Sequence, residues 1–224
     1  MNVILFGATG MIGQGVLREC LLDPDVTRVL SVARSSTGQH DDKLRELLHE
    51  DFTNFSAVER ELTGYDACFF CLGVSSAGMT EADYARVTYD FTLAAARLLA
   101  KANPEMTFIY VSGAGTDSSE KGRSMWARVK GRTENALLAL PFKAKFMFRL
   151  GFIQPMHGIV SRTRLYRVLY AAIAPLVPLL KAAFPSAITT TERVGRAMLA
   201  LAKRGGGKTL LENADVNALA GRTG

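Results

Sequence analysis

Short apolar runs alternate with longer segments of helical periodicity from the first residue of the chain. The apolar runs predict strands at residues 2–7, 28–33, 66–73, 107–113 and 145–151. Segments with apolar residues every three or four positions predict helices at 11–22, 42–50, 81–102, 124–140 and 191–203. A last apolar stretch at 208–213 follows a glycine run and indicates one more strand. Apolar strands that alternate with helices are typical of an α/β protein with a doubly wound parallel sheet.

The alternation of strands and helices stops between residues 152 and 190. This region mixes apolar pieces with prolines, and we predict that 155–190 form a small helical lid or substrate subregion. Within it, the apolar run 165–184 is interrupted by charged residues and prolines, whereas a membrane span needs ~20 unbroken residues. We expect a segment that covers a ligand, with peripheral membrane contact as the lesser alternative. The length of 224 residues suits a single domain, 1–224.

Composition and charge narrow the class of partner. The chain is 48% hydrophobic and 21% charged, which is typical of a soluble globular protein. Its net charge of +6 suits an anionic ligand, a nucleic acid or a membrane surface. The basic residues are scattered, however, with local density only at 123–132 and 162–167, and no nucleic-acid-binding motif accompanies them. A nucleic-acid partner is therefore not expected.

Cysteine usage and the first residues bear on the cellular compartment. Three cysteines form an odd count, which argues against a disulfide framework. Cys68 and Cys71 have the spacing of a redox pair but lie in a predicted buried strand, so we predict that both are small core residues. The chain starts directly on a strand, with no basic region or cleavage site before it. We therefore expect no secretory leader and a cytoplasmic location.

The turn between the first strand and the first helix carries the strongest chemical signal. Three glycines at a spacing of three residues are typical of a Rossmann-type dinucleotide site. They permit a tight turn, the approach of a pyrophosphate and the packing of the helix on the sheet. Backbone N–H groups and the helix dipole then favour the anion. The residues that we expect around it are Gly7, Thr9, Gly10, Met11, Ile12 and Gly13.

The residue that follows the second strand discriminates between the two nicotinamide dinucleotides. An NAD site usually has an acid there, which accepts hydrogen bonds from the ribose hydroxyls, whereas an arginine accommodates the 2′-phosphate of NADP. Here Arg34 occupies the position and is followed by two serines. We therefore predict NADP as the cofactor in preference to NAD. The plain structural alternative is a surface arginine on an α/β loop.

With these features, the chain resembles the short-chain dehydrogenase/reductase superfamily over residues 1–203. The stretch GATGMIG is similar to the turn of its atypical and extended members, which include NmrA-like and Tat-interacting-protein-like proteins and NAD-dependent epimerases. The resemblance implies that Asp51 meets the adenine amine, and that Leu72 and Gly73 lie against the adenine ribose. It also implies a loop along the nicotinamide, which consists here of Gly151, Phe152 and Ile153.

The catalytic residues of that superfamily are a serine after the fifth strand and a Tyr-x-x-x-Lys motif on the next helix. The resemblance places Ser112 on the serine and Lys130 on the lysine, which would hold the nicotinamide ribose. Trp126, the only tryptophan of the chain, falls where the tyrosine belongs. The tyrosine transfers its phenolic proton, whereas an indole N–H donates a hydrogen bond without exchanging its proton at neutral pH. The usual acid–base step therefore lacks its principal residue.

Two functions remain open from the sequence. The first is an NADP-dependent oxidoreductase or epimerase-like enzyme for an unknown, small hydrophobic carbonyl substrate, with Ser112, Lys130 and Trp126 at its centre. Among the histidines, only His157 is a candidate to replace the tyrosine as proton donor, and no metal-ligand spacing is present. The second is a non-catalytic redox sensor or scaffold that binds NADP(H) and a protein partner.

Overall fold

The structure, a computed structural model, describes residues 1–160 and 187–221. Its centre is a seven-stranded parallel sheet in the order β3-β2-β1-β4-β5-β6-β9. The predicted doubly wound parallel sheet is therefore confirmed, and so is its last strand. The strands are β1 (Asn2–Phe6), β2 (Arg28–Ala33), β3 (Leu44–Leu48), β4 (Ala67–Phe70), β5 (Thr107–Val111), β6 (Ala144–Arg149) and β9 (Leu210–Glu212).

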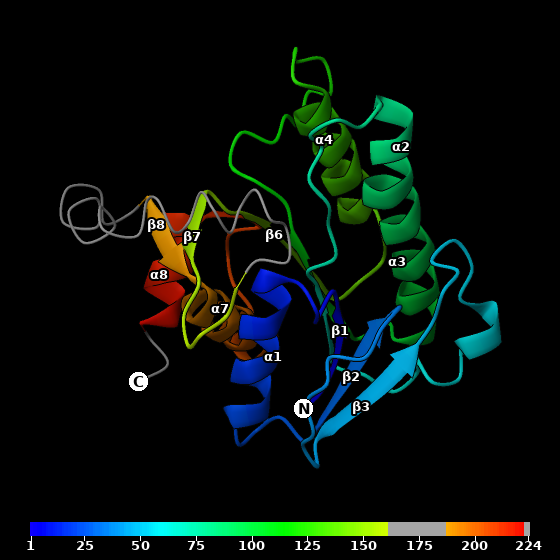
Figure 1. Ribbon diagram of the computed structural model, residues 1–224, viewed down its shortest axis with the longest axis vertical. Helices are drawn as coiled ribbons and strands as arrows, with labels where there is room; N and C mark the ends of the chain where they lie inside the picture. The colour runs from blue at the N-terminus through cyan, green and yellow to red at the C-terminus, as the bar shows by residue number, and fades with distance from the viewer. Residues whose placement is uncertain (161–186, 222–224) are drawn as a thin grey trace.

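Helices cover both faces of this sheet (Figure 1). Neighbouring residues of a strand point to opposite faces, so β1 supplies Leu5 to one core and Phe6 to the other. The core around Leu5 is closed by α1 (Met11–Leu22), α7 (Thr191–Arg204) and α8 (Asn213–Ala220). The opposite face carries α2 (Glu81–Ala85), α3 (Phe91–Ala102) and α4 (Met125–Leu138).

Close packing of α1 on α7 fixes the helix that follows the glycine turn. A methyl group at Gly15 would lie 2.5 Å from the Cβ atom of Thr191, and one at Gly195 would lie 2.8 Å from the side chain of Glu19. Neither position has room for a side chain, so the two helices approach backbone to backbone. As a result, α7 holds α1 and its N-terminus against the sheet.

The strand order reverses at β1, and this point locates the ligand site. The chain builds β2 and β3 on one side of β1 and then crosses to build β4, β5 and β6 on the other. Sheets of this kind bind ligands outside the carboxyl ends of the strands where the order reverses. The turn after β1 and the loops after β2, β4 and β5 all emerge at this edge.

Two predicted helices differ from the structure. The helix predicted at 42–50 is wrong, because Leu44–Leu48 form the edge strand β3. Leu44 and Leu47 have a helical spacing, but in the strand they face opposite sides and pack on different cores, so pairing with β2 overrides the local period. The helix predicted at 81–102 is divided by a π-helical turn, η2 (Arg86–Asp90). A short 3-10 turn, η1 (Ser56–Val58), precedes β4.

The predicted nicotinamide loop contains a strand that sequence reasoning did not foresee. Strand β7 (Phe152–Gln154) pairs in parallel with β8 (Ile188–Thr190) to form a second, two-stranded sheet. Asn213 at the start of α8 holds the first residues of both strands together. Its side chain accepts a hydrogen bond from Gly151 N–H at 3.1 Å and donates to the carbonyls of Ala187 and Phe152, at 2.5 and 3.2 Å.

Most of the predicted lid at 155–190 and the whole apolar run 165–184 lie outside the described residues. No helix within residues 1–160 and 187–221 is long and apolar enough to cross a membrane. Cys68 of β4 is buried in the core that contains Phe6, Cys71 packs against the opposite core, and burial raises the pKa of both thiols. The prediction that these cysteines are core residues is confirmed.

Candidate active site

The turn after β1 closes tightly around two of its three glycines. Gly7 has a φ of +81°, and a methyl group there would lie 2.7 Å from the backbone of Cys71 and Leu72. A methyl group at Gly13 would lie 2.0 Å from the carbonyl oxygen of Gly7. Glycine is therefore required at both positions for the turn itself.

Gly10 is different, because its backbone would accept a side chain. It has a φ of −81°, and within residues 1–160 and 187–221 a methyl group would meet only the Gly7 oxygen, at 3.4 Å. Gly10 is the N-cap of α1, which has no side-chain cap and no acidic residue in its first turn. The N–H groups at the start of the helix, on Met11 and Ile12, and the helix dipole are thus suited to an anion such as a pyrophosphate. Thr9 completes the turn, and its carbonyl accepts a hydrogen bond from Gln14.

Two neighbouring loops were expected to contact the adenosine. The loop after β4 lies against the glycine turn, since the Leu72 backbone approaches Gly7, and Gly73 beside it is exposed. The loop after β3 carries Asp51, whose carboxylate accepts hydrogen bonds from the Thr53 hydroxyl at 2.5 Å and the Thr53 N–H at 2.9 Å. These bonds lower the pKa of Asp51. Leu72 and Gly73 therefore lie beside the glycine turn, whereas the Asp51 carboxylate is hydrogen-bonded to Thr53 within its own loop.

Arg34 lies in an exposed loop directly after β2. Glu46 of β3 holds this loop, because its carboxylate accepts hydrogen bonds from the Ser36 hydroxyl at 2.5 Å and from the Thr37 N–H at 2.6 Å. The Glu46 carboxylate is thereby occupied by hydrogen bonds within its own chain. Arg34 itself places a positive charge at the carboxyl end of β2.

The loop after β5 lies against Trp126 in the first turn of α4. A methyl group at Gly113 would lie 3.4 Å from the indole ring, and one at Gly115 would lie 3.6 Å from it. Trp126 is half-buried. The bare backbone of the two glycines makes room for the indole, which forms part of the wall at the carboxyl end of β5.

Lys130 follows Trp126 by one helical turn and is also half-buried. Its ammonium group donates a hydrogen bond to the Val111 carbonyl at 3.3 Å and lies 5.2 Å from the centroid of the Tyr110 ring. Burial lowers the pKa of Lys130 to about 8, although the charge of Glu134 acts in the opposite direction. The structure thus brings Trp126 and Lys130 together beside the last residues of β5.

Ser112 is buried directly after β5, and its hydroxyl faces α4. It donates a hydrogen bond to the Glu134 carboxylate at 2.5 Å. Glu134 is fully buried and pairs with Arg149 at the end of β6, whose Nη2 and Nε lie 2.5 and 3.1 Å from the Glu134 Oε2. The Glu134 carboxylate raises the pKa of Arg149. The hydroxyl proton of Ser112 is therefore held by a buried ion pair.

A cavity of about 420 Å³ opens next to this region. Its wall includes Ala114 from the loop after β5, Arg149 and Gly151 from the end of β6, and Asn213 from α8. Gly151 lies beside Ala114, since a methyl group at Gly151 would be 3.7 Å from the Ala114 Cβ. The predicted nicotinamide loop therefore starts next to the loop of Ser112. Its next residues, Phe152 and Ile153, belong to β7.

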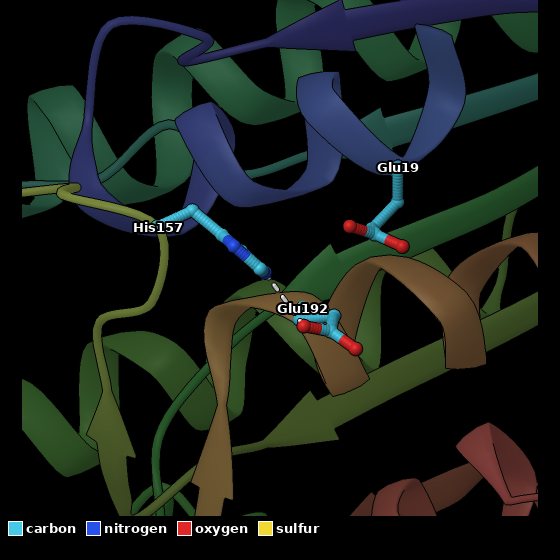
Figure 2. A group of neighbouring side chains, drawn as sticks. All are labelled: Glu19, His157 and Glu192. Carbon is cyan, nitrogen blue, oxygen red and sulfur yellow. Dashed lines mark hydrogen bonds and ion pairs between the residues drawn. The ribbon is translucent and has the colours of Figure 1, made fainter. Parts of the chain in front are cut away.

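His157, the histidine considered as a proton donor, belongs to an ion-pair network between α1 and α7 (Figure 2). Its Nε2 lies 2.7 Å from Glu192, and one ligand atom of each of His157, Glu192 and Glu19 lies within 4.8 Å of the others. This spacing is compatible with a metal, but Arg196 pairs with both carboxylates, at 2.8 and 3.1 Å, and Arg18 pairs with Glu19. The two guanidinium groups of Arg18 and Arg196 balance the two carboxylates. We therefore interpret this cluster as a set of ion pairs that holds α1, α7 and the segment after β7 together.

Residues 7–139 match the model of a protein family described as NAD(P)H-binding. The chain belongs to this NAD(P)H-binding family. The matched region begins at Gly7 and includes Trp126 and Lys130, so it contains both the glycine turn and the end of β5. The cofactor is therefore a nicotinamide dinucleotide, and the predicted class of ligand is confirmed.

Fungal proteins are similar to this member of the family over much of its length. Protein fmp52, mitochondrial, of Emericella nidulans is 28% identical over 159 residues, which cover 68% of this chain and 66% of the relative. Protein FMP52-1, mitochondrial, of Scheffersomyces stipitis is 26% identical over 155 residues, which cover 68% of this chain and 67% of the relative. The match thus spans about two thirds of the relatives' length.

The names of these relatives contradict the cytoplasmic location predicted from the sequence. Relatives in Emericella nidulans, Scheffersomyces stipitis and Debaryomyces hansenii are all named as mitochondrial proteins. The prediction is wrong because it rested on the lack of a secretory leader, a signal that does not separate cytoplasm from mitochondria.

Solved structures of nicotinamide-dependent enzymes share the fold of this NAD(P)H-binding protein. MoeE5, solved in complex with UDP-glucose and NAD, aligns with a TM-score of 0.69 and 16% identity, covering 100% of this chain and 82% of that one. A short-chain dehydrogenase/reductase from Saccharomyces cerevisiae aligns with a TM-score of 0.61 and 19% identity, covering 98% of each chain. The Rossmann-type fold of the short-chain dehydrogenase/reductase and epimerase group, as the resemblance implied, is confirmed.

Three residues of the site escaped the sequence analysis. Gly131, next to Lys130, lets the loop after β5 reach α4, since a methyl group there would lie 1.8 Å from the carbonyl oxygen of Asp117. Glu134 follows Lys130 by four residues, a spacing that places both on one helix face. Arg149 ends an apolar strand. The charges of Glu134 and Arg149 are the signal that could have indicated the buried pair.

Proposed function

We propose that the protein is an NADPH-dependent reductase of a small hydrophobic carbonyl compound. One arrangement carries the proposal: the uncapped glycine turn after β1 and the Trp126–Lys130 pair after β5 lie at the same edge of the sheet. Only β4 separates β1 from β5, so the two places are roughly 10 Å apart. A dinucleotide whose pyrophosphate occupies the turn can reach Lys130 with its nicotinamide end.

Each part of the dinucleotide has a group of this chain beside it. The bound nicotinamide supplies a hydride for the carbonyl carbon. Lys130 holds the nicotinamide ribose by hydrogen bonds from its ammonium group. The cavity beside Ala114 receives the substrate. The N–H groups of Met11 and Ile12 bind the pyrophosphate, and Arg34 binds the 2′-phosphate. Leu72 and Gly73, in the loop after β4, contact the adenine ribose.

Arg34→Ala tests the choice of NADP. We expect this exposed substitution to weaken NADPH binding roughly 10- to 100-fold, because it removes a charge-assisted contact to the 2′-phosphate, and to leave NADH binding unchanged. Titration calorimetry with both dinucleotides measures the effect. Arg60→Ala, at an exposed arginine after η1, controls for the loss of one positive charge. Tighter binding of NADH than of NADPH by the unaltered protein would overturn the choice.

A second function, a redox sensor without turnover, is favoured by two contacts at the end of β5. Trp126, which the resemblance aligns with the proton-transferring tyrosine, packs against Gly113 and Gly115, and the Ser112 hydroxyl donates a hydrogen bond to Glu134. Neither group then supplies a proton to a substrate carbonyl at neutral pH. In this alternative, the protein binds NADPH tightly, and a protein partner recognises the dinucleotide-bound form.

Trp126→Tyr separates the two functions. A phenol placed beside the Lys130 ammonium can donate its proton, so we expect it to raise the rate of carbonyl reduction roughly 10²-fold over that of the unaltered protein. NADPH oxidation with a panel of aldehydes, ketones and quinones measures this rate. Trp126→Phe, which fills the site without a hydroxyl, is the matched control. Tight NADPH binding with no turnover by either the unaltered protein or Trp126→Tyr would favour the sensor.

A further inference from the structure

The described side chains around the end of β5 are poor proton donors at neutral pH, with one exception. Trp126 does not exchange its indole proton in this range. The Ser112 hydroxyl donates to Glu134 at 2.5 Å, and the Thr116 hydroxyl donates to the Gly113 carbonyl at 2.7 Å. The exception is the ammonium group of Lys130.

Two further titratable groups near this loop are unsuited to donate a proton at neutral pH. The Asp117 carboxylate accepts hydrogen bonds from the Ser119 hydroxyl at 2.6 Å and the Gly122 N–H at 2.6 Å, and these bonds lower its pKa. It therefore carries no proton at neutral pH. Tyr110 is 1% exposed, and burial raises the pKa of its phenol, so that it keeps its proton inside the core.

Lys130 lies one helical turn from Trp126 and has a weakened hold on its proton. One N–H of its ammonium group donates to Val111 O at 3.3 Å, and the side chain is half-buried against the Tyr110 ring. The charges that face it are Glu134 on its own helix and, through Glu134, Arg149 of β6. Burial outweighs the opposing charge of Glu134 and lowers the pKa of Lys130 to about 8. An ammonium group of this acidity can serve as a general acid.

We propose that Lys130 is itself the proton donor of the reaction, in place of the residue that Trp126 replaces. This inference rests on the proposed reductase function. When hydride forms the new C–H bond at the carbonyl carbon, the π pair of the C=O bond moves to oxygen. That oxygen takes a proton from Nζ of Lys130, and the neutral amine then takes a proton from water. The nicotinamide is oxidised and the carbonyl is reduced to an alcohol.

The first test needs no cofactor. In the dinucleotide-free protein labelled with ¹³C-lysine, one Cε resonance, identified by its loss in Lys130→Arg, should titrate near pH 8, whereas exposed lysines titrate near 10.4. Lys143, an exposed lysine, is identified in the same way through Lys143→Arg and serves as the internal reference. A midpoint above pH 10 for Lys130 would overturn the proposal.

The second test follows the reaction. With NADPH saturating, the turnover number should fall as pH rises through the midpoint found for Lys130, because only the protonated amine donates. Lys130→Arg keeps the positive charge, but a guanidinium group does not release its proton in this pH range. The turnover number of this variant should therefore drop roughly 10²-fold, while its NADPH affinity changes far less. Undiminished turnover by Lys130→Arg overturns this proposal alone. NADPH binding without turnover by the unaltered protein overturns the reductase function and this proposal together.

Discussion

Gly10→Ala is expected to weaken dinucleotide binding roughly 10- to 100-fold without unfolding the protein. Gly10 has an ordinary φ of −81°, and among the described residues a methyl group would meet only the Gly7 oxygen, at 3.4 Å. The methyl group stands instead where a pyrophosphate approaches the N-terminus of α1, so charge-assisted hydrogen bonds to the phosphate are lost. Titration calorimetry with NADPH measures affinity, and urea unfolding measures stability, which should change by about 1 kcal/mol or less.

Two other glycines provide matched controls. Gly13→Ala places a methyl group 2.0 Å from the Gly7 oxygen and should therefore lose stability together with binding. A methyl group at Gly207 has no neighbour within 4 Å in the part of the chain that the structure describes, so Gly207→Ala should change neither property. Unchanged NADPH affinity in Gly10→Ala would mean that the pyrophosphate does not lie at this turn.

Glu134→Leu is expected to lower the free energy of unfolding by about 3–5 kcal/mol. The Glu134 side chain is 1% exposed, and that of its partner Arg149 is 17% exposed. Leucine would leave the guanidinium charge of Arg149 buried without a carboxylate and would take the hydrogen-bond acceptor from Ser112. Urea unfolding followed by circular dichroism measures the loss.

Two further variants isolate the cause of that loss. Glu105→Leu removes one partner of an exposed pair, Glu105–Lys143 at 3.3 Å, and should change stability by less than about 1 kcal/mol. The double variant Glu134→Leu/Arg149→Met removes both buried charges and should recover much of the stability that the single variant loses. A double variant as unstable as the single one would show that packing, and not the lone charge, sets the effect.

Most of the sheet could be predicted from the sequence because its strands are apolar on both faces. The central strands β1, β4 and β5 are continuous apolar runs, a pattern that only a covered parallel sheet satisfies. The edge strand β3 lacks this pattern, since two of its leucines pack on different cores and its charged residues face solvent. The strands β7 and β8 have three residues each and exist only because they pair across a long sequence separation.

The candidate site also combines features that the sequence predicts with features that it does not. The glycine turn is a local feature of consecutive residues, so its role follows from spacing. The pair Glu134–Arg149 depends on how α4 lies over β5 and β6, which no local pattern encodes. It also changes the expected role of Ser112, whose hydroxyl donates to Glu134. The engagement of Asp51 with Thr53, in contrast, involves residues two positions apart and is of a kind visible in sequence.

Energy transfer from Trp126 to bound NADPH tests whether the dinucleotide extends from the glycine turn to the end of β5. Trp126 is the only tryptophan of the chain, so its emission reports on that one place. We expect excitation of the indole to produce NADPH fluorescence that saturates at micromolar dinucleotide, and Trp126→Phe to abolish this signal. A protein that binds NADPH by calorimetry but shows no transfer from Trp126 would contradict the placement of the nicotinamide beside Lys130.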